Sequence, residues 1–347
     1  MPLNTTNRQL RIKLALFAAS FALLGNAPSD NIPAALQPYV VDGTLKTDDF
    51  GWMRGAFEGA NEQQKADLEA IKVWLMDCKA TAKMKAIDDL KDLGATDPKL
   101  DIAPTGTELC GSIANYIPMS EPTKNWDELL SNEAQARSIF AVYELGGKTA
   151  RQFSAYEPKW GTEESWDLLS STMMEQVYRK GMGWTGRADY PKIDAKLEPY
   201  LNAHLGNAAQ KADRKNTAML KAIVEKKGWP SISVVGERAS FNAWLLVQHA
   251  DSDPAFQLKS LRLMEPLAAK GDVSKRNYAY LYDRIMLQLS GKQRFGTQFS
   301  GCEGVEHKLR PLEDAALLDR VRQEHELEPI SDYQKSMKDN FGPCRAK

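Results

Sequence analysis

Residues 237–257 read E-R-A-S-F-N-A-W-L-L-V-Q-H-A-D-S-D-P-A-F-Q and decide the fold of the chain. The first part, Glu237 to His249, has apolar residues at the spacing of an amphipathic α-helix. Its predicted buried face consists of Phe241, Trp244, Leu245 and Gln248. Asp253 and Pro254 then form a helix start, with the aspartate as N-cap and the proline in the first turn. A short polar junction therefore connects two predicted helices.

Helical periodicity continues on both sides of this junction, so we expect a mainly α, multi-helical protein with a helical and loop-rich N-terminal extension. The predicted helices cover residues 62–93, 126–145, 163–180, 254–270 and 274–289, two helices within 193–227 separated near Gly206, one helix after Pro311 and a short one after Ile330. The predicted helix ends are Gly94, Gly146-Gly147, Gly181, Gly228, Gly271 and Gly291, and Thr162 is a predicted N-cap. Residues 28–60 and 95–124 are expected to be loops, and Ser231–Val235 is the best strand candidate.

The N-terminus has the pattern of a signal peptide. Arg8, Arg11 and Lys13 precede an apolar run from Leu14 to Gly25. This run is shorter than the roughly 20 apolar residues that span a bilayer. A small-x-small pattern ends at Ala27, although the following Pro28 is unfavourable for cleavage there. We expect export to the periplasm or secretion, with the uncleaved segment as a membrane anchor being the alternative.

This leader gives a predicted organisation in three parts. Residues 1–27 are the signal peptide, 28–160 an N-terminal extension, and 161–347 a C-terminal helical domain that carries the polar site. The full sequence has an ordinary globular composition, with 43% hydrophobic and 26% charged residues. The formal net charge of −1 provides no basic excess for binding phosphates along a duplex, which argues against a nucleic-acid partner.

Four cysteines, Cys78, Cys110, Cys302 and Cys344, are present in the chain. No Cys-x-x-Cys pair occurs, so the sequence does not support a zinc ribbon or a thioredoxin-like site. An even number in an oxidising compartment predicts two disulfides, and we favour the pairs Cys78–Cys110 and Cys302–Cys344. Each closed loop would stabilise its region by roughly 3–4 kcal/mol. Free buried thiols are the alternative.

His249 and Asp251 lie together in the junction between the predicted helices. An imidazole and a carboxylate at this spacing can form a general acid/base pair. The structural alternative is a hydrogen-bonded corner that fixes the junction. We identify no metal site, because no His-x-x-x-His pattern supplies further ligands, and the sequence identifies no cofactor.

Two further polar groups follow in the chain. Asp283 and Arg284 interrupt an apolar helical pattern, and a structural ion pair is the alternative to a functional role. The segment from Gln293 to Gln298 offers Arg294 for a carboxylate or phosphate and Gly296 for close backbone approach. A loop whose side chains satisfy helix ends is the alternative there. Glu175 and Arg179, at i,i+4, would by themselves form an ordinary surface pair.

These segments together resemble a bacterial domain family of unknown function, which is typically found in exported or uncharacterised proteins. The resemblance covers about residues 165–335 and rests on the ordered series Glu175-Gln-x-x-Arg179, Gly228-Trp-Pro, Gln248-His-Ala-Asp-x-Asp-Pro-x-Phe-Gln257, Tyr280-Leu-x-Asp-Arg284 and Gln293-Arg-Phe-Gly-Thr-Gln298. Phe295 stands where the family usually has tyrosine, which removes a hydroxyl from this chain. The resemblance implies the location of a site but no reaction.

The combined hypothesis is a polar pocket in the C-terminal domain. Its candidate catalytic residues are His249, Asp251 and Asp283, and its candidate ligand-binding residues are Glu175, Gln176, Arg179, Gln257, Arg284, Gln293, Arg294, Thr297 and Gln298. One reading is a hydrolase or transferase that acts on a polar or anionic envelope compound, with His249 as acid/base and Arg294 as substrate clamp. The other is a non-catalytic binding or scaffolding domain with a satisfied hydrogen-bond network. The expected partner is a small polar or anionic ligand.

Overall fold

A computed structural model describes residues 31–102, 104–154, 163–182, 192–303 and 306–341. Within these residues the protein is mainly α-helical, as predicted. The helices are α1 (Glu62–Asp92), α2 (Glu108–Tyr116), α3 (Trp126–Ser154), α4 (Glu163–Met182), α5 (Glu198–Lys227), α6 (Ile232–Val235), α7 (Glu237–Gln248), α8 (Pro254–Ala269), α9 (Lys275–Leu289), α10 (Leu318–Glu324) and α11 (Ile330–Phe341). Short 3-10 helices cover Gln37–Tyr39, Gly51–Ala56, Ile117–Ser120 and Ala195–Leu197.

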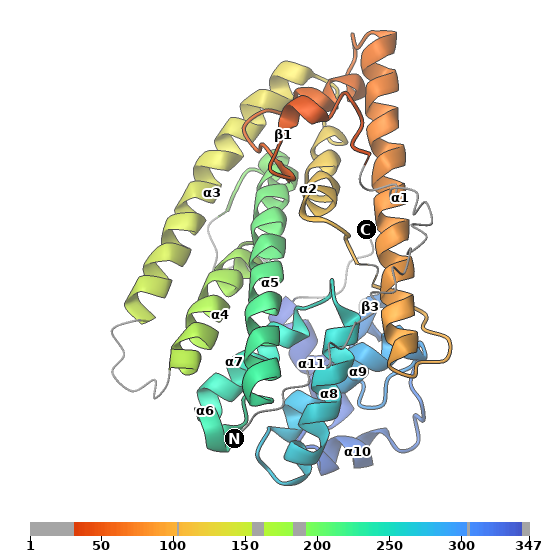
Figure 1. Cartoon of the computed structure of the whole chain (residues 1–347), viewed down its shortest axis with the longest axis vertical. Coiled ribbons are helices and arrows are strands. Elements are labelled where there is room, and N and C mark those ends of the chain that lie inside the picture. The colour runs from red at the N-terminus through yellow and green to blue at the C-terminus, as the bar shows by residue number, and fades with distance from the viewer. Residues whose placement is uncertain (1–30, 103, 155–162, 183–191, 304–305, 342–347) are drawn as a thin grey trace, which may run out of the picture.

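Two long helices, α1 and α5, connect the upper and lower parts of the molecule (Figure 1). Each contributes to two hydrophobic clusters. In α5, Leu201 and Leu205 join the cluster formed with α2 and α3, whereas Leu220 joins the cluster formed with α7, α8 and α9. In α1, Trp74 and Leu90 are divided in the same way. Apolar burial on both helices therefore ties residues before 160 to residues after it.

Helix α5 is continuous, so the predicted break near Gly206 is wrong. A Cβ added at Gly206 would lie 2.9 Å from the side-chain oxygen of Asn115, which extends from α2. The glycine thus permits close helix packing at a cost of about 1 kcal/mol in helix propensity. The predicted stop at Gly228 is confirmed, because its φ of 79° is the left-handed conformation that ends many helices.

Three other glycines were also predicted as helix ends and lie inside helices. Helix α3 passes through Gly146 and Gly147 to Ser154, and α4 passes through Gly181 to Met182. Added Cβ atoms would lie 3.1 Å from Met174 at Gly147 and 2.7 Å from Tyr143 at Gly181. These glycines serve the packing of α3 against α4, a tertiary effect that overrides their low helix propensity. Thr162, the predicted N-cap, lies outside the described residues.

Three local predictions differ from the structure. The segment predicted as the loop 95–124 contains α2, whose N-cap Thr107 accepts a hydrogen bond from the backbone N–H of Cys110. The strand candidate Ser231–Val235 is the short helix α6, held by the Asp272 carboxylate, which accepts from the backbone and hydroxyl of Ser233. The buried face of α7 includes Ala243, Leu246 and Val247 rather than Phe241, which is 44% exposed.

Sheet structure among the described residues is limited to two small antiparallel hairpins. Strand β1 (Val40–Val41) pairs with β2 (Thr44–Leu45), and β3 (Phe299–Glu303) pairs with β4 (Glu306–Leu309). The β3–β4 pairing has a register irregularity between Phe299 and Cys302. The sequence analysis predicted neither hairpin, because their strands are too short to establish a clear alternation of apolar and polar residues.

The disulfide Cys78–Cys110 is present and joins α1 to α2, as predicted. Cys302 is disulfide-bonded as well, while Cys344, its predicted partner, lies outside the described residues. The predicted signal peptide, residues 1–27, also lies outside them. In the part of the chain that the structure describes, no helix has the length and apolar character needed to cross a membrane.

Candidate functional site

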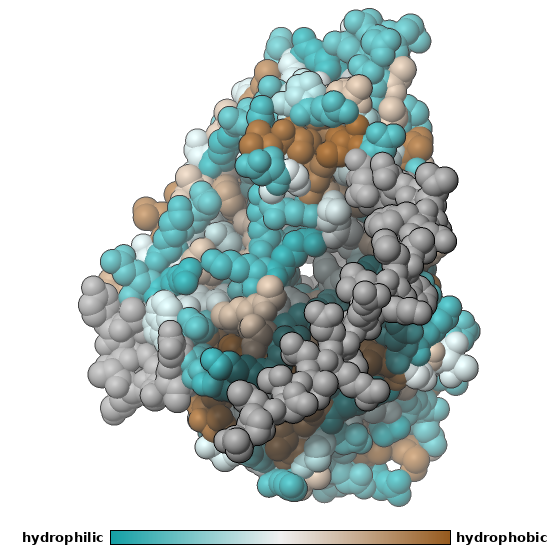
Figure 2. Space-filling view, viewed as in Figure 1, coloured by the Kyte–Doolittle hydropathy of each residue, from teal (hydrophilic) through white to brown (hydrophobic). Residues whose placement is uncertain are grey.

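A cleft of about 510 Å³ opens between the middle of α5, the α7–α8 junction and the segment before α2. The visible face of the molecule is largely hydrophilic and is hollowed at mid-height (Figure 2). The cleft is lined by Ile102, Pro104, Thr105, Arg179, Met182, Gly206, Ala209, Gln210, Asp213, Arg214, Thr217, Ala218, Lys221, His249, Ala250, Asp251, Ser252 and Asp253. Its size falls within the range of about 300–1,000 Å³ that is common for small-molecule sites.

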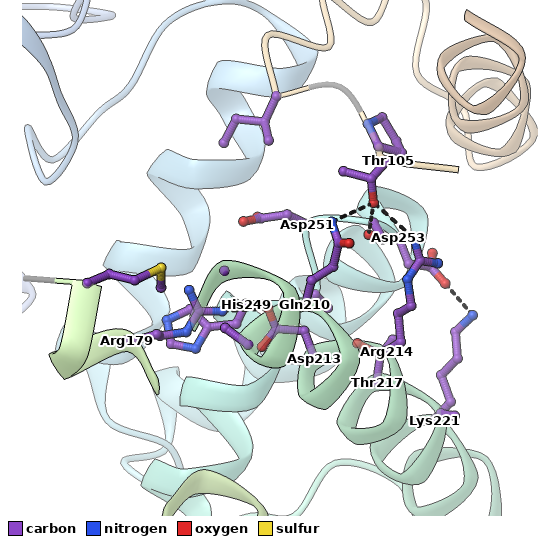
Figure 3. A pocket seen from close by; sticks show the side chains of 18 residues that line it. Thr105, Arg179, Gln210, Asp213, Arg214, Thr217, Lys221, His249, Asp251 and Asp253 are labelled. Atoms are coloured by element: carbon purple, nitrogen blue, oxygen red, sulfur yellow. Dashed lines mark hydrogen bonds and ion pairs between the residues drawn. The ribbon is translucent and has the colours of Figure 1, made fainter. Parts of the chain in front are cut away.

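Three helices bring ionisable side chains together at one end of this cleft. Glu175 and Arg179 are one turn apart on α4, Asp213 extends from the middle of α5, and His249 is the C-cap residue of α7. Arg179, Asp213 and His249 lie close together in Figure 3. One ligand atom from each of Glu175, Asp213 and His249 lies within 4.8 Å of the others. We refer to Glu175, Arg179, Asp213 and His249 as the acid–base cluster.

Glu175 is fully buried behind the cleft and is held in its ionised form. Its Oε2 lies 2.5 Å from Nε of Arg179 and 3.1 Å from Nδ1 of His249, and its Oε1 accepts a hydrogen bond from Gln176. Burial raises the pKa of Glu175, but the hydrogen bonds and charges of these neighbours outweigh it, so the pKa lies below its ordinary value. Glu175 is therefore a permanent negative charge behind the imidazole of His249.

Asp213 binds the same guanidinium, but its pKa is shifted in the opposite direction from that of Glu175. Its Oδ2 lies 2.6 Å from Nη2 of Arg179, whereas its buried Oδ1 has no hydrogen-bond partner among the described residues. Burial raises the pKa of Asp213 to about 6, although the charges of Arg179 and His249 oppose the increase. Two adjacent carboxylates with separated pKa values are characteristic of acid–base sites.

Asp213 was not predicted as a site residue because its neighbourhood, K-A-D-R-K, resembles a solvated helix surface. The detectable signal is its position on α5. Leu205, Ala209, Asn216 and Leu220 are buried, and residue 213 continues their helical spacing. A carboxylate on the buried stripe of a helix requires either a partner or a function.

His249 lies on the cleft wall with 16% of its side chain exposed. Its Nδ1 is within hydrogen-bonding distance of Glu175, but the two groups are not aligned for a hydrogen bond, and Nδ1 is buried without another partner. Catalytic hydrogen bonds are often poorly aligned in the absence of substrate, so this geometry is compatible with a role for the pair.

Glu175, Asp213 and His249 are also the one group among the described residues whose side chains could hold a metal ion. Arg179, however, places its guanidinium on both carboxylates, at 2.5 and 2.6 Å. A cation bound between them would have to displace this charge or bear its repulsion. The arrangement therefore fits proton transfer better than metal coordination.

Asp251, a predicted catalytic residue, lies on the cleft wall but is paired on its other side. Arg284 donates to Oδ1 and Oδ2 of Asp251 at 2.8 and 2.5 Å. Gln257 donates to Asp251 and to the backbone carbonyls of Val247 and Gln248. Asp251, Gln257 and Arg284 thus brace the α7–α8 junction that positions His249. Asp253 is the N-cap of α8, as predicted.

Asp283 lies outside the cleft, buried on α9, where its carboxylate organises the loop 293–298. It accepts hydrogen bonds from the backbone N–H groups of Arg294, Phe295 and Thr297 and from the hydroxyl of Thr297. The backbone carbonyls of Phe295 and Gly296 accept from the buried Arg322. All four acceptor contacts of Asp283 are thus made within the protein.

The other predicted residues of this loop also contact the protein itself. Gln293 donates to the backbone of Gln298 and Arg310 and accepts from the backbone N–H of Gln298, and Gln298 donates to Thr297. Arg294 pairs with Glu313 at 2.8 Å and lies over the ring of Tyr282. These side chains, together with Asp283, form a separate group that does not line the cleft.

A second buried polar network, also missed from the sequence, surrounds His204 on α5. Nε2 of His204 lies 3.1 Å from Glu133, and Nδ1 lies 3.1 Å from the hydroxyl of Tyr116. The Asn207 side chain donates to Tyr116 and accepts from Ser112. These groups join α2, α3 and α5 and satisfy one another within the core. None of them lines the cleft.

The sequence of residues 166–345 matches the model of one protein family, described as a family of unknown function, DUF6624. The matched range begins in α4 and contains the whole acid–base cluster, whereas the cleft residues Ile102, Pro104 and Thr105 precede it. No curated protein and no solved structure matches the chain. The family match covers more than half of the chain, so the protein belongs to the family of unknown function DUF6624.

Proposed function

We propose that this protein is an acid–base enzyme, a hydrolase or transferase, that acts on a small polar substrate in the cleft beside His249. The observation that carries the proposal is the convergence of Glu175, Asp213 and His249 within 4.8 Å at the cleft wall. Groups that transfer protons must lie within hydrogen-bond reach of a bound substrate, and the position of Asp213 and His249 in the cleft lining supports the proposal. The other predicted site residues include Asp283 and Arg294. Among the described residues, both are bonded to groups of the protein outside the cleft.

The two carboxylates give the cluster a division of roles. His249 takes the proton of an attacking hydroxyl, which is water in a hydrolase or a second substrate in a transferase. The ionised Glu175 orients the imidazole and stabilises the imidazolium that forms. Asp213 in its protonated form donates its proton to the leaving group. The proton held by His249 then returns to Asp213, and the cluster is restored.

Arg179 is a positioning residue in this scheme. It holds both carboxylates through separate guanidinium nitrogens, Nε for Glu175 and Nη2 for Asp213. The fork fixes the two acids relative to each other, because a bidentate guanidinium allows little rotation. Asp251 and Arg284 hold the junction that carries His249 and act on the reaction only through it.

The place of action we propose is outside the cytoplasm, in the bacterial periplasm or after secretion. The support is the N-terminal pattern of three basic residues followed by a short apolar run, together with the Cys78–Cys110 disulfide. The substrate would then be a compound of the cell envelope or its surroundings.

A non-catalytic ligand-binding domain is the second candidate. It is favoured by the tight bonding of both carboxylates to Arg179, which also describes a satisfied structural network. An enzyme would convert the compound that binds in the cleft, whereas a binding domain would bind it in the same cleft without turnover.

The test is a panel of chromogenic carboxylic esters, phosphate esters, glycosides and amides, assayed with the wild type and with H249Q and D213N. We expect the wild type to turn over at least one class and each substitution to lower kcat by about 100-fold or more. D97N, which removes a carboxylate that is 82% exposed and paired only with Lys99, should leave kcat unchanged.

Folding of each variant is checked by circular dichroism and thermal unfolding. If folded H249Q and D213N turn over the same substrate at the wild-type rate, the cluster is not catalytic. If the folded wild type binds compounds in the cleft but turns none over, the binding domain is the correct reading.

A further inference from the structure

Arg214 is a cation of the cleft whose charge is not balanced by an ion pair. Among the three lining cations, Arg179 pairs with Glu175 and Asp213, and Lys221 pairs with Asp253. Arg214 contacts neutral groups only among the described residues. Its Nη2 donates to the hydroxyl of Thr105 at 2.9 Å and to the backbone carbonyl of Thr107 at 3.0 Å.

One donor of this guanidinium has no partner. Nε of Arg214 is buried and makes no hydrogen bond with any described residue. Burial lowers the pKa of Arg214, and Glu108, whose charge raises it, is itself paired with Lys211 at 3.1 Å. A buried donor without a partner and a half-buried charge without an ion-pair partner are both unfavourable. A bound anion would supply the missing counter-charge.

The surroundings of Arg214 are fixed rather than loose. The hydroxyl of Thr105 accepts from Gln210 at 3.0 Å as well as from Arg214, and it lies 3.4 Å from the hydroxyl of Ser252. These contacts join the segment before α2, helix α5 and the α7–α8 junction (Figure 3). The guanidinium is therefore held in place before a ligand arrives, which lowers the entropic cost of binding.

The carboxylates that share the cleft do not compete for Arg214. Asp213 is bonded to Arg179, Asp251 to Arg284 and Asp253 to Lys221. Asp251 and Asp253 are thus each paired with a cation of their own, and Asp213 shares Arg179 with Glu175, so Arg214 has no ion-pair partner among the described residues. Because Asp213, His249 and Arg214 all line the cleft, a group bound to Arg214 shares that cleft with the acid–base cluster.

We propose that Arg214 binds a carboxylate or phosphate oxyanion of the substrate, so that the enzyme acts on a small anionic compound. This inference rests on the proposed function in one respect only, namely that the cleft is the substrate site. The anion would bind the guanidinium of Arg214 from the cleft, and Ser252 and Gln210 are neutral neighbours for its remaining oxygens. The bond that reacts would lie toward Asp213 and His249.

The test uses inorganic phosphate and acetate as two separate probes, each titrated into the full-length protein at constant ionic strength set with chloride. Binding is followed by the Nε–H resonance of Arg214 and by thermal unfolding. We expect saturable binding of one or both anions by the wild type. R214Q should weaken it by about 10- to 100-fold, since one charge-assisted hydrogen bond and one charge are lost.

Two matched variants control for charge and for folding. R214K retains the charge but has no Nε–H donor, and we expect it to bind more weakly than the wild type and more tightly than R214Q. K221Q removes a lining cation that already has Asp253 as partner, and it should change binding by less than about threefold. The stronger probe identifies whether the substrate carries a phosphate or a carboxylate.

The proposal is overturned if the wild type binds neither anion, if the Arg214 Nε–H resonance does not respond, or if K221Q weakens binding as much as R214Q. Its failure is distinguishable from failure of the catalytic proposal. Anion binding that depends on Arg214 without any turnover would sustain this inference alone, whereas turnover of neutral substrates that depends on Asp213 would sustain the catalytic proposal alone.

Discussion

At the scale of single residues, the site depends on one guanidinium that serves two carboxylates. Arg179 helps His249 and Gln176 to lower the pKa of Glu175, and it limits the rise of the Asp213 pKa that burial causes. Without it, two carboxylates would lie next to each other with His249 as the remaining nearby cationic group. The negative charges would then destabilise the folded state.

We predict that R179M lowers the free energy of unfolding by about 3 kcal/mol at pH 8, because two buried carboxylates lose their counter-charge. Their folded pKa values would rise, so each contributes stability below its unfolded pKa that is lost as the pH rises through the folded value. The deficit should therefore shrink between pH 8 and pH 5. Urea unfolding at several pH values measures it.

The control is R276M, which removes an arginine that is 46% exposed and paired with Glu328. Its effect should stay within about 1 kcal/mol and vary little with pH. A deficit in R179M that is equally small, or one that grows toward acid, would contradict the electrostatic role of Arg179.

Site residues could be predicted from the sequence only where a recognisable motif surrounds them. Glu175, Arg179, His249 and Asp251 were candidates because their segments have a recognisable order, and the structure places three of them on the cleft wall. Asp213 was not a candidate, because local polarity outweighed the helical register that reveals its buried position. Which of these residues are catalytic stays a prediction.

At the scale of elements, the polar loop 293–298 illustrates how a motif can serve the fold. Asp283 binds the N–H groups of the loop, and Arg322 binds its carbonyl groups. Gly296, with a φ of 64°, provides the left-handed turn between them. The dense polar sequence therefore has a structural explanation that sequence spacing alone could not separate from a ligand site.

We predict that D283N lowers the free energy of unfolding by about 2–4 kcal/mol. The amide keeps one acceptor oxygen but presents N–H groups toward donors of the loop, which leaves buried donors unsatisfied. Chemical denaturation measures the change. E313Q, which weakens the ion pair with the exposed Arg294, should cost less than about 1 kcal/mol, and equal effects of the two substitutions would contradict the structural role of Asp283.

Helix ends, like the polar loop, could not be predicted reliably from sequence alone. Gly228 ends α5 with a φ of 79°, whereas Gly206 and Gly181 lie inside helices where neighbouring side chains approach them closely. A glycine that stops a helix and a glycine that permits close packing have the same sequence signature, and the backbone conformation and tertiary neighbours distinguish them.

At the scale of the whole molecule, the cleft draws on both sides of the predicted boundary at residue 160. Thr105 precedes the family match, while Arg179, Asp213 and His249 lie within it. Helical periodicity was sufficient to predict the mainly α fold. It could not predict that α1 and α5 would join two hydrophobic clusters, because such contacts connect residues far apart in sequence.

The central claim is that Asp213 is a proton donor at the wall of the cleft. The most direct measurement is the titration of its side-chain carboxyl carbon by NMR in the wild-type protein, assigned with D213N. The account predicts a midpoint at about pH 6, since burial raises the pKa against the opposing charges of Arg179 and His249. A midpoint at or below the ordinary value of 3.8 would show a permanently ionised Asp213 and would contradict its role as the acid.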